Sequence, residues 1–385
     1  MNKKIAAYVV IGLSLFILSI GVSYLAFSGG SKSTGLVSKV LPTPTPVKVS
    51  RRPTVDPALP KTEVCPMNGL KYTTLEKEKW EKLWPLAVMI ENSPDSRPQS
   101  GLSVADIVYE AVAEGGVSRF MAIYHCGLAA GGIRVAPVRS ARIYYTKLVP
   151  EYDALYNHVG GAGNCDDPTV DERAKALCFI RLNKIKDLDQ FGLDFKACHR
   201  LTNRLDKEVA YEHTMACFTD ELYKVAIDKR KFTAWNPKKF TPWKFGESDQ
   251  SKGAIGNIKF DFWKNKPQFT VGWKYDVATN TYLRSTAGEQ QIDLDTEEKI
   301  AAKNIVIQFV KETGPLDEHN HMYYEVLGTG KMLLFQNGEA IEGTWSKASF
   351  ASRTKFMDST KKEIEFTPGQ IWIELVPAAN KIEYN

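Results

Sequence analysis

The chain has 385 residues, of which 43% are hydrophobic and 25% charged, a composition typical of folded rather than disordered proteins. This length predicts two globular units, since a domain usually has about 100–200 residues. The formal net charge of +5 is small for this length and no long basic run occurs, so composition excludes an electrostatic footprint for nucleic acid.

An uncharged apolar segment, residues 5–27, follows Lys3 and Lys4. As a helix it would be roughly 35 Å long, enough to span the hydrocarbon layer of a membrane. We predict a single transmembrane helix behind a cytoplasmic tail, 1–4, because positive charges stay on the cytoplasmic side. The alternative is a cleaved signal peptide, whose apolar core usually has about 7–15 residues. The predicted location is the cell membrane, crossed once, with the rest of the chain outside the cytoplasm.

Residues 28–62 are rich in Ser, Thr, Gly and Pro and contain few large apolar side chains. Such a segment cannot bury a core, and its Thr-Pro repeat at 43–46 favours extended backbone. We predict a flexible linker between the membrane and the folded body.

All cysteines follow the predicted membrane helix, in a compartment where disulfides persist. They are Cys65, Cys126, Cys165, Cys178, Cys198 and Cys217. An even count fits pairing, and six cysteines allow fifteen connectivities, among which the sequence does not choose. The short separations from Cys165 to Cys178 and from Cys198 to Cys217 are the easiest to close.

The first globular part, residues 63–228, alternates strand and helix signals and predicts a mixed α/β domain. The continuous apolar run 86–90 predicts a strand buried on both faces. Residues 103–114 have an S-x-x-D start and apolar side chains at helical spacing, with two glycines after them, so we expect a helix. The run 117–125 predicts a second strand. Together these signals predict a strand, helix, strand unit.

Two further elements complete this part. Residues 141–149 predict a helix that stops at Pro150, and residues 153–159 predict a strand that leads into the glycine-rich run 160–163. That run lacks the G-x-G-x-x-G spacing of a dinucleotide site, and we expect no cofactor.

The second part, residues 256–385, changes to short strands with tight turns and predicts an antiparallel β-rich domain. Asn337 and Gly338 are a strong signal for a two-residue hairpin turn. Residues 229–255, between the parts, are charged and aromatic, and we treat them as a connector. The predicted fold class is therefore α+β, a mixed α/β domain followed by an antiparallel β domain. The strands expected in the second part are 268–276, 281–286, 304–310, 322–327 and 331–336.

Three acids, Asp106, Glu110 and Glu114, recur every fourth residue along the predicted helix, opposite its apolar side chains. Like charges at this spacing repel, so cations should lie nearby. The candidates in adjoining segments are Arg97, Arg119, Arg139 and Arg142. Two interpretations stay open, a solvated or ion-paired helix face and a polar pocket. If the strand, helix, strand unit is parallel, Glu114 and Arg119 fall at the edge opposite the end of the first strand.

Two details favour the pocket. Glu91 and Asn92 stand where the first strand ends, the edge at which open α/β sheets bind ligands. Arg139, Ser140 and Arg142 stand at the start of a predicted helix, where free N–H groups add to the guanidinium charge and stabilise an anion. A carboxylate or a phosphate is the expected ligand group.

Histidines offer weaker signals. His158, at the end of a predicted strand, could act as a general base at neutral pH, or serve as a hydrogen-bonded structural residue. His319 and His321 form an H-x-H pair in a predicted loop, a weak indication of metal binding. No nucleophile or zinc motif occurs, so we expect no metal and assign no catalytic residue.

Several stretches resemble the YerB family of bacterial surface proteins. In the first part these are CPMNG at 65–69, PLAVMIENSPDSRPQSGLSVADIVYEAVAEGGVSRF at 85–120, PVRSARIYY at 137–145 and YDALYNHVGG at 152–161. In the second part they are 304–310, 327–347 and 366–377, which are similar to that family's C-terminal domain. The resemblance implies two domains of unknown function and a surface location, because family members are typically lipoproteins; it implies no reaction.

The resemblance also implies that polar residues of the first part match characteristic positions of the family. These are Glu91, Arg97, Gln99, Glu110, Glu114, Arg119, Arg139, Ser140, Arg142 and His158. The chain departs from the family in two ways. It has a predicted transmembrane helix instead of a lipidated cysteine, and the loop after His158 contains Cys165 and an acidic stretch.

We expect a membrane-anchored, extracytoplasmic protein that binds an anionic cell-envelope ligand, such as a cell-wall polymer, or serves as an envelope accessory protein. The predicted ligand-binding residues are the ten just named together with Asn92. One alternative is a cell-wall hydrolase or lyase, with Glu91 or Glu114 as acid and His158 as base. Another is a structural partner of envelope machinery that works through the β-rich part. The expected partners are the membrane and the anionic ligand, and no nucleic acid.

Overall fold

The computed structural model describes residues 56, 58–232, 235–247 and 252–385, which belong to one compact unit, 48–385. Among them no helix has the length and apolar character needed to cross a membrane. The segment 5–27 lies outside the described residues, so the transmembrane helix stays a prediction.

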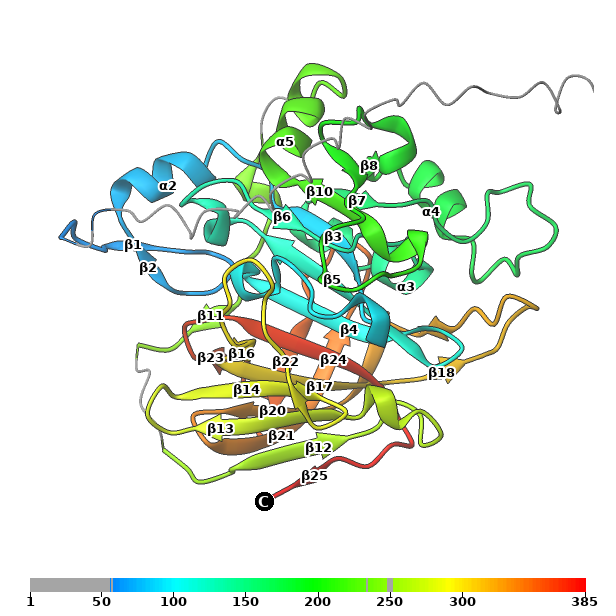
Figure 1. The fold of residues 1–385 in the computed structure, drawn as a ribbon. Helices are drawn as coiled ribbons and strands as arrows, with labels where there is room; N and C mark the ends of the chain where they lie inside the picture. The colour runs from blue at the N-terminus through cyan, green and yellow to red at the C-terminus, as the bar shows by residue number, and fades with distance from the viewer. Residues whose placement is uncertain (1–55, 57, 233–234, 248–251) are drawn as a thin grey trace, which may run out of the picture. The chain divides into compact units, whose positions relative to one another are not determined.

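Ten strands form the central sheet, and both predicted parts contribute to it (Figure 1). In spatial order they are β22 (Lys355–Asp358), β21 (Glu339–Lys347), β20 (Gly328–Gln336), β17 (Asn304–Val310), β24 (Ile371–Pro377), β4 (Ile107–Glu114), β5 (Val117–Tyr124), β3 (Leu86–Glu91), β7 (Leu155–His158) and β8 (Lys186–Asp189). The parts meet where β24 pairs in parallel with β4, and Glu374 lies directly across from Glu110. The two predicted domains therefore share one sheet and one continuous core.

Smaller sheets and short helices surround the central sheet. The second sheet has the order β15 (Glu289–Gln290), β14 (Thr281–Thr286), β13 (Val271–Asp276), β12 (Asn257–Phe260) and β25 (Glu383–Tyr384), with β16 (Ala301–Ala302) on β14. The others are β6 (Arg134–Val135) with β10 (Met215–Phe218) and β9 (Cys198–Arg200), β1 (Glu63–Val64) with β2 (Lys71–Tyr72), β11 (Lys244–Phe245) with β23 (Glu365–Phe366), and β18 (Glu312–Thr313) with β19 (Tyr323–Tyr324). The α-helices among the described residues are α2 (Thr74–Trp80), α3 (Ile143–Thr146), α4 (Ala176–Leu182) and α5 (Thr219–Asp228). The 3₁₀ helices include η4 (Val149–Tyr152), η5 (Gln190–Gly192) and η6 (Tyr211–Thr214).

The helix predicted over 103–114 is wrong, because most of this segment forms strand β4, antiparallel to β5. Every side chain of β4 except the last, Glu114, is buried. A central strand with core on both faces suits its β-branched and aromatic residues, and this packing overrides the helical spacing. Gly115 and Gly116 have φ angles of 54° and 85° and form a two-residue hairpin turn instead of a helix end.

Other elements of the first part are closer to expectation. The strands predicted at 86–90, 117–125 and 153–159 are confirmed as β3, β5 and β7. The helix predicted over 141–149 is shorter, since α3 has a single turn and η4 follows it. Pro150 lies in the first turn of η4, where its missing N–H leaves no hydrogen bond unmade.

The second part is β-rich, as predicted, but not wholly antiparallel, since β17 pairs in parallel with β24. The hairpin at Asn337 and Gly338 is confirmed, with φ angles of 55° and 74° between β20 and β21. Strand β20 begins at Gly328, so Gly328 and Gly330 lie within one strand. They do not separate the strands predicted at 322–327 and 331–336. The described chain as a whole is mostly β, with few helices.

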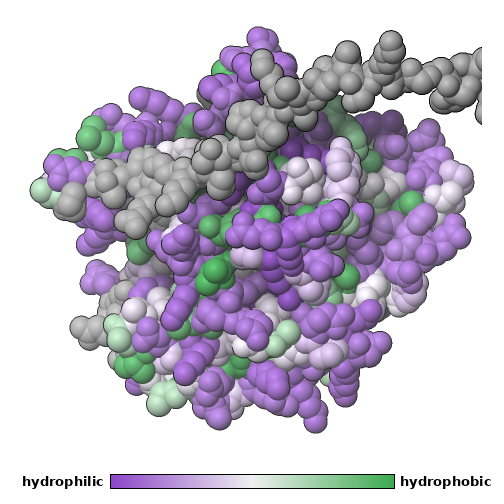
Figure 2. Space-filling view, viewed as in Figure 1, coloured by the Kyte–Doolittle hydropathy of each residue, from purple (hydrophilic) through white to green (hydrophobic). Residues whose placement is uncertain are grey.

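Different elements cover the two faces of the central sheet around β4. On one face the second sheet packs, and Trp273 of β13 donates to Glu374 of β24 at 3.2 Å. On the other face lies η4, whose Glu151 accepts a hydrogen bond from Tyr109 of β4 at 2.8 Å. On the side shown in Figure 2, hydrophilic residues predominate and hydrophobic ones are scattered. That side offers polar groups, not an extended apolar patch, to a partner.

All six cysteines are paired, as their even number indicated. The disulfides are Cys65–Cys126, Cys165–Cys178 and Cys198–Cys217. The two short separations favoured by the sequence both occur, and the last disulfide links partners across β9 and β10. Three disulfides fit an oxidising compartment outside the cytoplasm.

Candidate functional site

Strands β17, β24, β4, β3, β7 and β8 all run in the same direction, so their carboxyl ends meet at one edge of the sheet. Four of them end in a titratable residue: Glu91 in β3, Glu114 in β4, His158 in β7 and Asp189 in β8. Open sheets of this kind bind ligands outside the carboxyl ends of their strands. Because β4 is a strand parallel to β3, Glu114 lies at the same edge as Glu91.

Two arginines hold the Glu114 carboxylate. Arg119 contacts Oε1, and Arg142 donates to Oε2 from Nε at 3.0 Å and from Nη2 at 2.6 Å. Arg119 also donates to the carbonyl of Ser140 at 3.0 Å. Burial alone would raise the pKa of Glu114, but the charges of Arg119 and Arg142 outweigh it and lower the pKa to about 2. Burial and the charge of Arg142 lower the pKa of Arg119 to about 10.

A second carboxylate, Glu91, contacts His213 and Arg139. Its Oε1 is 2.9 Å from Nδ1 of His213 and 3.6 Å from Nε of Arg139. Its other oxygen, Oε2, is buried and has no hydrogen-bond partner among the described residues. Arg139 also donates to the carbonyl of Glu212 at 3.2 Å. The segment before β10 therefore closes over the end of β3.

We call these side chains the carboxyl-edge cluster: Glu91, Glu114, Arg119, Arg139, Arg142 and His213. The cluster sets three guanidinium groups against two carboxylates, so it has a surplus of one positive charge when His213 is neutral. The Arg139 side chain is 23% exposed, so one positive charge of the cluster reaches the surface. Such an arrangement can hold a carboxylate or a phosphate by charge-assisted hydrogen bonds.

His158 lies at the same edge but is closed off. Its Nδ1 is 2.7 Å from the carbonyl of Gly160 and its Nε2 is 2.8 Å from Oδ1 of Asp187. The ring is fully buried and links β7 to β8. Neither ring nitrogen is free for the general-base role considered from the sequence.

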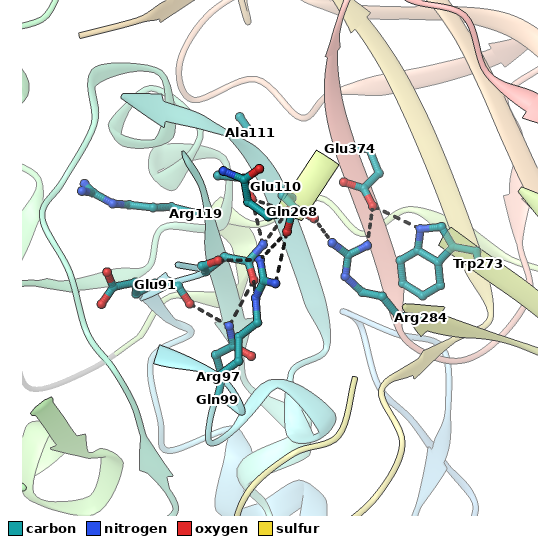
Figure 3. A network of polar contacts seen from close by, with 12 residues as sticks. Glu91, Arg97, Gln99, Glu110, Ala111, Arg119, Gln268, Trp273, Arg284 and Glu374 are labelled. Carbon is teal, nitrogen blue, oxygen red and sulfur yellow. Dashed lines mark hydrogen bonds and ion pairs between the residues drawn. The ribbon is translucent and has the colours of Figure 1, made fainter. Parts of the chain in front are cut away.

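The other predicted residues lie on the opposite face of β4 and β5 (Figure 3). Glu110 pairs with Phe120 across these strands, whereas Arg119 pairs with Ala111. Neighbouring residues of a strand point to opposite faces, so Glu110 and Arg119 project away from each other. The three acids predicted to share one helix face therefore lie in three environments: Glu114 in the cluster, Glu110 on the opposite face, and Asp106 beside Asn68 and His125.

Glu110 is the centre of a buried polar network. It accepts hydrogen bonds from Nδ2 of Asn92 at 3.1 Å and from Oγ of Ser118 at 2.6 Å, and it pairs with Arg284 at 2.5 Å. Arg284 also donates to Glu374 at 3.3 Å, so one guanidinium lies between two carboxyl groups. None of these three charged side chains has any exposed surface.

Aromatic rings complete the surroundings of Arg284. Its guanidinium carbon lies within 5.6 Å of three ring centroids, those of Phe120, Trp273 and Trp372. The pKa of Glu374 is raised well above its ordinary value, mainly by burial and secondly by the charge of Glu110. Glu374 therefore favours its protonated form, which limits the charge that this interior must hold.

Asn92 joins this network to the surface. Its Oδ1 accepts from Nε of Arg97 at 3.1 Å and from Nε2 of Gln99 at 3.2 Å. Arg97 also donates to the carbonyl of Gln268 at 3.2 Å. We call the following residues the junction network: Asn92, Arg97, Gln99, Glu110, Ser118, Arg284 and Glu374.

The predicted site is thus divided. The carboxyl edge brings together Glu91, Glu114, Arg119, Arg139, Ser140 and Arg142. The junction network holds Asn92, Arg97, Gln99 and Glu110, and His158 is tied to its own neighbours. Five surface hollows of 320 to 780 Å³ are lined by other residues, four of them in the second part of the chain.

Two family models match the chain, described as the N-terminal and the C-terminal domain of a protein of unknown function (DUF3048), over residues 72–232 and 258–373. A protein of Bacillus subtilis (strain 168) named "Putative lipoprotein YerB" is 31% identical over 317 residues, 81% of this chain and 86% of that protein. The chain belongs to the YerB family. The crystal structure of YerB from Bacillus subtilis matches with a TM-score of 0.69 at 28% identity, covering 84% of this chain and all of that one.

One group of potential metal ligands occurs among the described residues of this YerB family member: Cys65, Asp106 and Cys126, within 4.8 Å of one another. The two sulfurs are bonded to each other, so no thiolate is available. Asp106 instead accepts hydrogen bonds at 2.6 Å from the Asn68 side chain and from the amide of His125, and burial raises its pKa to about 7. In the H-x-H pair, His321 binds Asp317 at 2.9 Å.

Sequence reasoning missed four residues of these two groups, and one of them, Ser118 of β5, carries no charge that would mark it. His213 comes from a segment with no motif, and 122 positions separate it from Glu91, so no local signal identifies it. Arg284 alternates with Tyr282 and Thr286 in β14, and all three point inward. Glu374 interrupts an apolar run in β24. Arg284 and Glu374 could have been found from the sequence, because each is a charged residue at a position of its strand that faces the core.

Proposed function

We propose that this chain is an extracytoplasmic envelope protein whose carboxyl-edge cluster binds an anionic ligand of the cell envelope. The ligand group is a carboxylate or a phosphate on a cell-wall polymer or a fragment of one. Arg139 makes the first contact, and Arg119 and Arg142 supply further positive charge. Glu114 holds those two guanidinium groups in position.

The observation that carries this proposal is the gathering of three guanidinium groups, Arg119, Arg139 and Arg142, around the carboxylates Glu91 and Glu114 at the edge of the sheet. Arg142 lies close enough to Arg119 for its charge to contribute to the lowered pKa of Arg119. A bound anion relieves repulsion of this kind. The Arg139 side chain is 23% exposed and can turn toward such a ligand.

Three properties support the extracytoplasmic location. The chain has three disulfides, which fit an oxidising compartment. Its relative from Bacillus subtilis is named as a lipoprotein, a class that is anchored to membranes. The apolar segment 5–27 is long enough, as a helix, to serve as the membrane anchor in this proposal.

Isothermal titration of the full chain with muropeptides and with teichoic acid fragments tests the proposal. We expect binding of at least one of these anions, weakened about ten-fold by Arg139→Ala, the loss of one charge-assisted contact. The matched control is Arg181→Ala, an exposed arginine on α4 that makes no ion pair or hydrogen bond with the described residues of the cluster. No heat with any fragment, or equal affinity of Arg139→Ala and the wild type, contradicts the proposal.

A cell-wall hydrolase or lyase is the second candidate, and the Glu91–His213 contact favours it. A carboxylate on Nδ1 orients the imidazole and leaves Nε2 to take up a proton from a substrate. Purified cell wall would then be digested by the wild type and not by Glu91→Gln or His213→Gln. Equal release of fragments by all three proteins would remove this candidate.

A further inference from the structure

We propose that the carboxyl-edge cluster binds an acidic saccharide, whose anionic group meets Arg139 and whose sugar ring stacks on the exposed side chains of Phe191 and Tyr211. This inference rests on the proposed function and adds the class of ligand. It depends on two aromatic rings and one unpaired carboxylate oxygen, which a simple anion would leave unused.

The first ring is Phe191, in the 3₁₀ helix η5 that follows β8. This residue is 78% exposed. Its ring lies over Gly160, where an added Cβ would be 3.1 Å from Cε2 of the phenyl group. The carbonyl of Gly160 accepts from the amide of Ala141 at 2.9 Å, and Ala141 stands between Ser140 and Arg142. Phe191 therefore borders the cluster at the end of β8.

The second ring is Tyr211, in η6. This residue is 69% exposed and lies two positions before His213. The carbonyl of Glu212, between them, accepts the hydrogen bond from Arg139. The guanidinium carbon of Arg200 lies 3.9 Å from the ring centroid, so a cation supports the ring while most of the residue stays open to solvent.

Rings of this kind suit a sugar because one face of a pyranose presents C–H groups, whereas its hydroxyl groups remain polar. Two exposed aromatic residues, Phe191 and Tyr211, each joined to the cluster through a neighbouring residue, offer ring faces to such a ligand. The other strongly exposed phenylalanine of this loop, Phe195, is already stacked on His199, with ring centroids 4.9 Å apart.

The unpaired oxygen adds a second requirement. Oε2 of Glu91 is buried and accepts no hydrogen bond from a described residue, while Arg139 lies beside the same carboxylate. The inference requires this oxygen to become open to a donor when the Arg139 side chain turns from Oε1 toward an anion. A sugar acid brings both an anionic group for the arginine and hydroxyl donors for the glutamate.

Isothermal titration of the full chain with matched compounds tests the inference. N-acetylmuramic acid is compared with N-acetylglucosamine, which lacks the lactyl carboxylate, and with D-lactate, which lacks the sugar ring. Glucuronic acid and glucose form a second pair. We expect each sugar acid to bind about ten-fold more tightly than its neutral sugar and than D-lactate, the worth of one charge-assisted contact or one stacked ring.

Variants separate the contribution of the rings. Phe191→Ala and Tyr211→Ala should each weaken sugar-acid binding several-fold, Tyr211→Phe should retain it, and Phe195→Ala is the matched control with no effect. All these side chains are exposed, so folding is preserved. If sugar acids bind no better than D-lactate, or Phe191→Ala and Tyr211→Ala leave their affinity unchanged, the saccharide inference is wrong while anion binding stands. If the neutral sugars bind equally well, the inference is also wrong; if no anion binds, the proposed function itself fails.

Discussion

The junction network and the carboxyl-edge cluster are built from the same charged residue types on opposite faces of the same strands, but they differ in balance and exposure. In the junction network Glu110 neutralises Arg284, because Glu374 favours its protonated form, and none of the three is exposed. In the cluster, three arginines meet two glutamates, and Glu114 and Arg139 are 28% and 23% exposed.

This difference separates a structural role from a binding role. Charges removed from water must be paired and hydrogen-bonded, so a buried network tolerates no surplus and no exchange of partners. A cluster in contact with water can keep an extra cation, because solvent stabilises it until a ligand arrives. The junction network therefore joins the two parts of the central sheet, whereas the carboxyl-edge cluster remains able to bind.

The largest effect is expected for Arg284→Met. Removing this guanidinium leaves Glu110 buried without its cation, which costs about 3–5 kcal/mol of unfolding free energy. Urea unfolding followed by circular dichroism measures the loss. The double variant Arg284→Met with Glu110→Gln should regain part of it, because the uncompensated charge is gone. A loss below about 1 kcal/mol, the range of a surface ion pair, would mean that the network does not hold the parts together.

The pH dependence of stability in Glu374→Gln tests the same network. The pKa of Glu374 is raised in the folded protein above its ordinary value of 4.5, so the folded state holds a proton that the unfolded state loses. Stability is therefore fully present below pH 4.5 and falls as the pH rises, by about 1.4 kcal/mol per pH unit from this group. Glutamine does not titrate, so urea unfolding at pH 5, 6 and 7 should show the variant gaining on the wild type. Parallel pH profiles would show that Glu374 is ionised in the fold.

Glu114→Gln should give a pH dependence of the opposite sign. The charges of Arg119 and Arg142 outweigh burial and lower the pKa of Glu114 from 4.5 to about 2, so its contribution is present above pH 4.5 and is lost as the pH falls toward 2. Between pH 5 and pH 3 the wild type should lose about 2 kcal/mol more than the variant. Acid unfolding of both proteins measures this difference. If the two lose stability equally, Glu114 is not held by the arginines in solution.

Much of the strand content followed from sequence pattern alone. Short apolar runs such as 86–90 and the Asn337–Gly338 turn carry local signals that fold as expected. The segment 107–114 did not, because its apolar side chains satisfy helical spacing and a strand buried on both faces equally well. Pairing with β24, more than 250 positions away, decides between them, and no single sequence reveals that partner.

Sequence patterns predicted most residues of the site but not how these residues are arranged in space. Glu91, Glu114, Arg119 and Arg142 were named from local patterns, and the structure brings them to one edge. Glu110 was assigned to the same group, but it lies on the other face of β4. Side chains alternate along this strand, and the irregular pairing between Val112 and Glu114 places Glu114 on the face opposite Glu110. Which of two faces a charge occupies depends on strand register, which helical periodicity misassigned here.

Arg139→Ala should change stability least, by about 1 kcal/mol or less, because this side chain is partly exposed and Glu91 keeps its hydrogen bond to His213. Its removal also relieves repulsion that lowers the pKa of Arg119. The same variant should bind the anion about ten-fold more weakly, since it lacks a charge-assisted contact. Urea unfolding and isothermal titration on one preparation measure both. If Arg139→Ala loses as much stability as Arg284→Met, Arg139 has a structural role. The carboxyl-edge cluster and the junction network would then no longer differ in function.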